Sequence, residues 1–152
     1  MATATDLAFA EQFGHLRQIA EHKGWDLKEI DGPGFVLGLS ACDGSRLWLK
    51  AECDGFQGKP PAWHWYNPDS GTHDAPADTP KGSGGYFHSS GRLCAPWNRL
   101  AYKSIDPRGP HEDWELSSWI ANPKTGQCAT LAAMALRIAV ELNSSRFTGR
   151  MV

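Results

Sequence analysis

Two consecutive prolines, Pro60 and Pro61, place the strongest constraint on how this chain can fold. Neither residue has an N–H group to donate to a sheet ladder, so the pair cannot lie inside a paired strand. Strand-like runs precede the prolines at residues 34–40 and 46–53, joined by an Asp-Gly turn, and the aromatic run 63–66 follows them. We therefore expect an antiparallel hairpin, a rigid connector and a third strand.

Apolar residues at helical spacing mark the two ends of the chain. The first helix is predicted over residues 5–22, with Thr5 or Asp6 as its cap and Gly24 just past its end. A second helix is predicted between residues 125 and 143. The apolar stripes are Phe9, Phe13, Leu16 and Ala20 in the first helix, and Leu131, Met134, Ala135, Ile138 and Leu142 in the second. Helices flanking an antiparallel meander of three to four strands predict an α+β fold.

Length and composition indicate one globular domain over residues 1–152, with 41% hydrophobic and 21% charged residues. A net charge of −2 with scattered lysines and arginines argues against a surface for nucleic acid or anionic membrane. The first residues lack the basic and apolar pattern of a secretory signal, and no apolar run reaches the length of a membrane span. We therefore expect a cytoplasmic protein.

Several aromatic and cysteine residues are interpreted as packing groups. Tryptophans in strand-like runs are predicted to be core residues: Trp48, Trp63 and Trp65. Three cysteines in or beside predicted elements are interpreted as structural: Cys42, Cys53 and Cys128. The sequence has no Cys-x-x-Cys pair, so the spacing of zinc ribbons and thioredoxins is lacking, and no cofactor is implied.

Three segments show no clear long element. Residues 67–86 are rich in proline and glycine and are predicted to form a long loop, of a length typical of loops that are functional or disordered. Residues 98–123 contain scattered prolines and allow short helical turns. Residues 144–152 are a polar tail that is expected to fray unless it docks on the rest of the protein.

The candidate for chemistry is the run from residue 85 to 98, GYFHSSGRLCAPWN, which holds His88 and Cys94. Glycines around the run allow the backbone to bend. A cysteine that loses its proton is a strong nucleophile, and a nearby imidazole favours the thiolate. Because free cysteines are often buried packing groups, that interpretation is the alternative for Cys94 taken alone.

Two motifs resemble those of ubiquitin-conjugating enzymes. Residues 56–65, FQGKPPAWHW, are similar to the segment of that family with paired prolines that leads into its third strand. Residues 88–94, HSSGRLC, are similar to the His-Pro-Asn and Gly-x-Ile-Cys segments that end at the catalytic cysteine of the family. The resemblance extends over about residues 5 to 143 and implies a ubiquitin-conjugating-enzyme-like fold with a catalytic-cysteine loop at Cys94.

The chain also departs from the family pattern. No His-Pro-Asn tripeptide is present, so the asparagine that steadies the oxyanion in the family lacks a counterpart at its usual place, which leaves His88 or Asn98 as substitutes. The segment 98–123 is longer than is usual for the family, and one long helix follows it instead of two. These features resemble the divergent bacterial relatives found with ubiquitin-like proteins and activating enzymes, several of which serve in antiviral (phage) defence.

The resemblance implies an acyltransferase that accepts a ubiquitin-like protein on Cys94 as a thioester from an activating enzyme and passes it to an amine. In that hypothesis Cys94 is the nucleophile and His88 its polar assistant, and the acceptor and any ligase are left open. One alternative is a catalytically inactive scaffold of the same fold. Another is a metal-dependent or Cys-His hydrolase, although its residues lack metal-ligand spacing: His64, His73, His88, Cys94 and His111.

Overall fold

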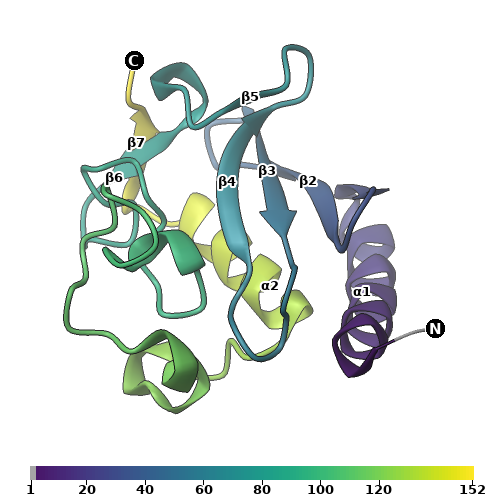
Figure 1. The fold of residues 1–152 in the computed structure, drawn as a ribbon. Helices are drawn as coiled ribbons and strands as arrows, with labels where there is room; N and C mark the ends of the chain where they lie inside the picture. The colour runs from purple at the N-terminus through teal and green to yellow at the C-terminus, as the bar shows by residue number, and fades with distance from the viewer. Residues whose placement is uncertain (1–2) are drawn as a thin grey trace.

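The computed structural model describes residues 3–152 and has an α+β architecture, with an N-terminal helix, an antiparallel sheet of five strands and a C-terminal helix (Figure 1). The two helices are α1 (Ala4–Lys23) and α2 (Leu131–Leu142). The sheet has the order β1 (Asp26–Ile30), β2 (Gly34–Ser40), β3 (Arg46–Glu52), β4 (Ala62–Asn67) and β5 (Thr72–His73). A separate antiparallel pair consists of β6 (Pro80–Gly82) and β7 (Phe147–Arg150).

The elements predicted from the sequence are present. The hairpin β2–β3 and the strand β4 lie on either side of the paired prolines, and the helices lie at the two ends of the fold. Helix α1 begins one residue earlier than predicted. The predicted cap, Thr5 or Asp6, is wrong, because Thr3 is the N-cap and forms a reciprocal capping box with Asp6. Gly24 ends this helix in the left-handed conformation, with φ of 73°, as expected.

Three features differ from the predictions. Strand β1 was not predicted, because its residues are largely exposed and show no clean alternation of apolar and polar side chains. The segment 67–86 is not a continuous loop, since it contains β5, a short 3-10 helix at Pro76–Asp78 and β6. The tail predicted to fray unless it docks does dock, because β7 pairs with β6.

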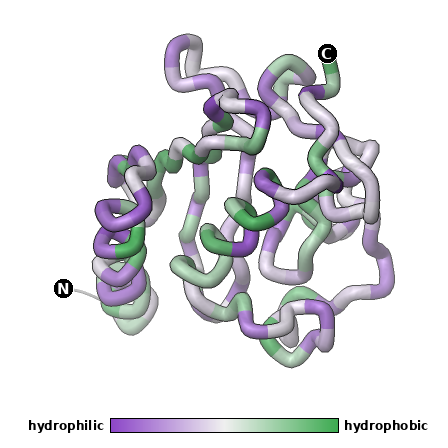
Figure 2. Tube along the Cα trace, turned by 180° about the vertical axis from the view of Figure 1, so that it is seen from behind, coloured by the Kyte–Doolittle hydropathy of each residue, from purple (hydrophilic) through white to green (hydrophobic). Residues whose placement is uncertain are grey.

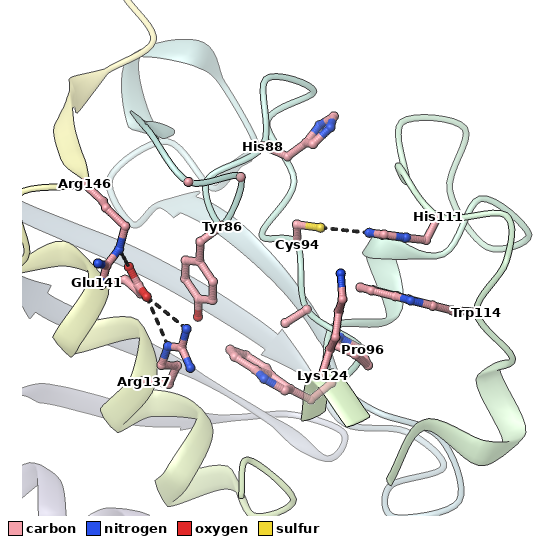
Figure 3. A pocket seen from close by; sticks show the side chains of 14 residues that line it. Tyr86, His88, Cys94, Pro96, His111, Trp114, Lys124, Arg137, Glu141 and Arg146 are labelled. Carbon is pink, nitrogen blue, oxygen red and sulfur yellow. Dashed lines mark hydrogen bonds and ion pairs between the residues drawn. The ribbon is translucent and has the colours of Figure 1, made fainter. Parts of the chain in front are cut away.

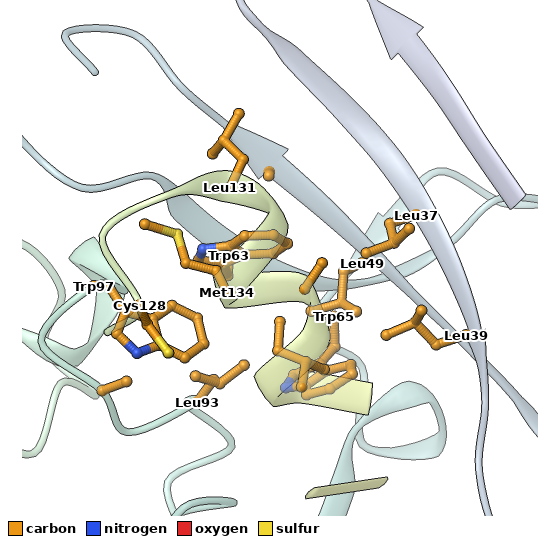
Figure 4. Close-up of a cluster of buried hydrophobic side chains, with 14 of the residues drawn as sticks. Leu37, Leu39, Leu49, Trp63, Trp65, Leu93, Trp97, Cys128, Leu131 and Met134 are labelled. Carbon is orange, nitrogen blue, oxygen red and sulfur yellow. The ribbon is translucent and has the colours of Figure 1, made fainter. Parts of the chain in front are cut away.

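The core lies between the sheet and α2. Cross-strand rows such as Phe35, Ala51 and Trp63 point to one face, and the buried residues of α2 pack against that face (Figure 4). Trp63 and Trp65 are buried as predicted. The prediction for Trp48 is wrong: this side chain is only partly buried and lies on the opposite face of β3, where it covers Gly38 of the neighbouring strand.

The connector between β3 and β4 is fixed by a buried arginine. Arg99 Nε donates to the carbonyl of Pro60 at 3.0 Å, and its two terminal nitrogens reach the side-chain and backbone oxygens of Asp54. The Arg99 N–H donates to the carbonyl of Pro61 at 2.8 Å. These bonds attach the start of segment 98–123, through the short 3-10 helix Arg99–Ala101, to the proline connector.

Hydrophobic and hydrophilic residues are interspersed along both helices (Figure 2). Among residues 3–152, no helix combines the length and the apolar character that crossing a bilayer requires.

Helix α2 offers a matched test of this packing. Ile138 is 0% exposed, whereas Val140, two residues further on, is 59% exposed. Ile138→Ala should lower the free energy of unfolding by about 2–5 kcal/mol, because it leaves a cavity under the sheet. Val140→Ala should change it by less than about 0.5 kcal/mol. Urea unfolding of the two variants measures both, and equal effects would contradict this account of the core.

Candidate active site

Cys94 lies on one limb of a tight turn in the segment between β6 and the 3-10 helix Arg99–Ala101. The Cys94 N–H donates to the Tyr86 carbonyl at 2.9 Å, and the Gly91 N–H donates to the His88 carbonyl at 2.9 Å. Gly91 has φ of 87°, which glycine adopts without the steric cost that a Cβ atom would bring. Backbone hydrogen bonds between the two limbs of the turn thus fix the position of the thiol.

A buried guanidinium two residues before the cysteine attaches this turn to the rest of the protein. Arg92, 5% exposed, pairs with Asp74 at 2.7 Å and with Asp106 at 2.6 Å. Burial alone would raise the pKa of Asp74, but hydrogen bonds from His64 and Arg92 outweigh it and hold this pKa below its ordinary value. Asp106 belongs to segment 98–123, so Arg92 joins the cysteine turn to that segment.

Segment 98–123 brings His111 to the thiol. The His111 N–H donates to the Ala101 carbonyl at 3.1 Å, and the Lys103 N–H donates to the His111 carbonyl at 2.9 Å. The buried Tyr102 hydroxyl donates to the Pro96 carbonyl at 2.7 Å, next to the cysteine turn. As a result His111 Nε2 lies 3.2 Å from Cys94 Sγ (Figure 3).

The second nitrogen of His111 has a partner of its own. Nδ1 lies 3.2 Å from a carboxylate oxygen of Asp113, and the ring stacks on Trp114 with centroids 3.4 Å apart and planes 7° apart. If Nδ1–H donates to Asp113, Nε2 carries the lone pair that faces the thiol. The bond from His111 also lowers the pKa of Asp113, which keeps this carboxylate charged. Cys94, His111 and Asp113 therefore have the geometry in which a thiol, a base and an orienting carboxylate can act in series.

Burial sets the resting state of the thiol. Removal from water raises the pKa of Cys94, and the positive charge of Lys124 opposes that shift only in part. The resting group is therefore the neutral thiol near pH 7. Attack on a carbonyl then requires that the proton leave as the sulfur–carbon bond forms, and His111 Nε2 is positioned to take it.

His88, the base expected from the sequence, lies at the same cavity but does not contact the thiol. Its Nδ1 is 2.9 Å from the Ser90 hydroxyl and accepts the Ser90 N–H at 3.0 Å, and its ring points away from Cys94 (Figure 3). Among the described residues, the imidazole within hydrogen-bonding distance of Cys94 is that of His111. His111 was predicted from the sequence only as part of the hydrolase alternative, because it lies 17 positions after the cysteine and no motif links the two residues.

Asn98 does not serve as an oxyanion donor in this structure. Its side chain is 0% exposed, its oxygen accepts the N–H groups of Trp63 and Leu100, and its nitrogen donates to the Leu93 carbonyl at 2.8 Å. The N–H of Ala95 makes no hydrogen bond to the described residues and directly follows the nucleophile. It is therefore the better candidate donor to an oxyanion.

The remaining histidines and cysteines lie in other surroundings. His64 bonds Asp74 and Glu52 through its two ring nitrogens and stacks on His73. Cys53 and Cys128 are buried as expected. Cys42 lies in an exposed turn after β2, and its N–H donates to the Leu142 carbonyl at the end of α2 at 3.1 Å. Within residues 3–152, no group of three or more histidine, cysteine or acidic side chains is placed to hold a metal ion.

The thiol opens into a cavity of about 610 Å³. One end is formed by Cys94, His111, Trp114 and Lys124, and the other by Tyr86, Arg137, Glu141 and Arg146 (Figure 3). At the second end both arginines bind the buried Glu141, at 3.0 and 2.8 Å, so this trio carries one net positive charge. The cavity is thus positively charged at both ends and can admit a polar or anionic chain beside the thiol.

Comparisons of the chain with models of protein families, with curated proteins and with solved structures give no match. No family is therefore assigned to the chain. Three structural features bear on the function of the protein: the fold, the contacts from Cys94 to His111 to Asp113, and the cavity into which the thiol opens.

The raised pKa of Cys94 predicts how its alkylation depends on pH. The rate of modification by iodoacetamide should rise through a midpoint above the value of about 8.5 typical of free cysteine, because burial disfavours the thiolate. Mass spectrometry of the digested protein over a pH series measures this rate, with a cysteine peptide as the reference. A midpoint below that of the peptide would contradict the assignment of a neutral resting thiol.

Proposed function

We propose that the protein is a conjugating enzyme that carries a ubiquitin-like protein as a thioester on Cys94 and transfers it to an amine. The observation that carries this proposal is the 3.2 Å contact between Cys94 Sγ and His111 Nε2 at the edge of an open cavity. A thiol used only for packing has no need of a base whose other nitrogen is oriented by a carboxylate.

The order of elements supports a ubiquitin-conjugating-enzyme-like fold. A helix, an antiparallel meander, a double-proline connector, a cysteine segment and a final helix follow one another as in that family. The long segment 98–123 supplies His111, the base proposed for Cys94. This composition of the site agrees with a divergent, bacterial-type member that works with an activating enzyme in the cytoplasm, in antiviral defence.

Loading of the enzyme proceeds by thioester exchange. The Cys94 sulfur attacks the carbonyl carbon of the incoming thioester while its proton passes to His111 Nε2. The Ala95 N–H, which follows Cys94 and makes no hydrogen bond to the described residues, is the candidate donor to the oxyanion of the tetrahedral intermediate. The carbon–sulfur bond to the donor then breaks, and the departing thiolate recovers the proton from His111. Asp113 steadies the imidazolium between these two steps.

Discharge follows the same course with an amine as the nucleophile. The neutral amine attacks the thioester carbonyl, an amide bond forms, and the carbon–sulfur bond to Cys94 breaks. His111 accepts the proton that the amine loses and returns it to the Cys94 thiolate. One imidazole thus serves both half-reactions, and the enzyme returns to the free thiol at the end of the cycle.

A second candidate function, a thiol hydrolase, is favoured by the same Cys94–His111–Asp113 series. In a hydrolase, water instead of an amine attacks the acyl-enzyme. A peptide thioester with a C-terminal glycine separates the candidates: a carrier accumulates a stable adduct, a hydrolase releases the free acid with turnover, and an inactive scaffold leaves the probe unchanged.

Replacement of the nucleophile tests the carrier chemistry directly. The wild-type protein mixed with the peptide thioester should gain one acyl mass that thiol reductant removes, and Cys94→Ala should gain none. The exposed Cys42 provides the control, since Cys42→Ala should leave the adduct intact. Intact-mass spectrometry measures both, and a reducible adduct that persists in Cys94→Ala would refute the assignment. Repetition with a ubiquitin-like protein, its activating enzyme and ATP tests the substrate.

The role of His111 is tested by its own substitution. His111→Gln should slow adduct formation by about 10² to 10⁴-fold, the range typical of a lost general base. His88→Gln should leave the rate unchanged, because that ring bonds Ser90 and not the thiol. Stopped-flow or quenched mass measurements give the rates. If His88→Gln loses activity and His111→Gln does not, His88 is the base, as expected from the sequence.

A further inference from the structure

One lysine, Lys124, lines the cavity together with Cys94 and His111. It lies in the short 3-10 helix Pro123–Thr125, which is fixed at three points. The Asn122 side chain accepts the Lys124 N–H at 3.0 Å, Pro123 restricts the first position of the helix, and the buried Thr125 hydroxyl donates to the Trp119 carbonyl. The backbone of Lys124 is therefore anchored beside the thiol.

The amine of Lys124 is directed to the reactive groups. Its positive charge acts on both the Cys94 thiol and the Asp113 carboxylate, which places it near both ends of the catalytic series. The close-up shows its nitrogen pointing toward the Cys94–His111 pair (Figure 3). Lys124 is exposed and its ammonium makes no ion pair or hydrogen bond with the other described residues. This amine is thus free to take part in chemistry at the thiol.

We propose that Lys124 is an internal acceptor, so that the acyl group carried on Cys94 moves to the Lys124 amine and modifies the protein itself. This inference rests on the proposed function, because it requires the thioester. In the step, the neutral Lys124 nitrogen attacks the thioester carbonyl, a carbon–nitrogen bond forms and the carbon–sulfur bond to Cys94 breaks. The proton from the amine passes to His111 and then to the Cys94 thiolate, which leaves a free thiol and an isopeptide bond.

Proximity explains why this acceptor competes with external amines. An amine anchored at the same cavity meets the thioester as an intramolecular partner, with an effective concentration far above that of a dissolved amine. When no external acceptor is present, self-modification is therefore the expected fate of the loaded enzyme. It removes the positive charge of Lys124 from the cavity and fills the space next to Cys94 with the transferred chain, so the modified protein is expected to lose further loading activity.

An alternative role for Lys124 is purely electrostatic, as a fixed positive charge near the oxyanion. Lys124→Arg separates the two roles, because arginine keeps the charge but does not act as an acyl acceptor at ordinary pH. If the role is electrostatic, this variant behaves as the wild type. If Lys124 is the acceptor, the variant still forms the thioester adduct on Cys94 but does not convert it to the self-modified form.

The test uses the full-length protein and a peptide thioester with a C-terminal glycine, followed over time by intact-mass spectrometry. In the wild type, an early adduct that hydroxylamine and thiol reductant remove should convert to one that resists both, at a rate that rises with pH because only the neutral amine attacks. Tryptic digestion should place the resistant adduct on Lys124 as a missed cleavage. Lys124→Arg should keep the early adduct and lose the resistant one.

Lys103→Arg is the matched control, since Lys103 is an exposed lysine of segment 98–123 that does not line the cavity, and it should convert as the wild type does. A resistant adduct in Lys124→Arg equal to that of the wild type overturns this inference, as does a reducible adduct that never converts. Absence of any adduct in the wild type instead overturns the proposed function, and this inference with it.

Discussion

The ion pairs of Arg92 are the interaction on which the site depends. This buried guanidinium joins two carboxylates that are 32 positions apart in the chain, Asp74 after β5 and Asp106 in segment 98–123. Loss of one partner from a buried pair typically costs about 3–5 kcal/mol, because the remaining charge stays in a poorly solvated place. The Arg92 ion pairs therefore hold the cysteine turn and segment 98–123 together, and breaking either pair would destabilise the fold.

The sheet supplies the frame for this contact. The inner rows of β2, β3 and β4 pack on α2, while the outer face of β4 presents His64, which bonds Asp74. Arg99 fixes the start of segment 98–123 to the proline connector that leads into the same strand. The charges around the cysteine turn are thus positioned by the strand that the paired prolines introduce.

Short-range sequence patterns predicted most of the helices and strands that support the site. Helical spacing located both helices, and the paired prolines located the connector, because these signals depend on neighbouring residues. Strand β1 gave no such signal. Trp48 was assigned to the core because it lies in a strand-like run, but it alternates with the buried Leu47 and Leu49 and therefore lies on the other face of β3. The Cys94 turn was recognised from its glycines and its residue types. Its partner was not, because His111 reaches the thiol through backbone bonds to residues 101 and 103 and through the Tyr102–Pro96 contact.

The stacking of Trp114 on His111 has a spectroscopic consequence. The indole covers one face of the imidazole ring at a centroid distance of 3.4 Å, so a proton gained by His111 appears directly above an aromatic π system. A protonated imidazole in that position quenches indole fluorescence. The residue that stacks on His111 is therefore also an optical indicator of it, because Trp114 emission depends on whether the imidazole carries a proton.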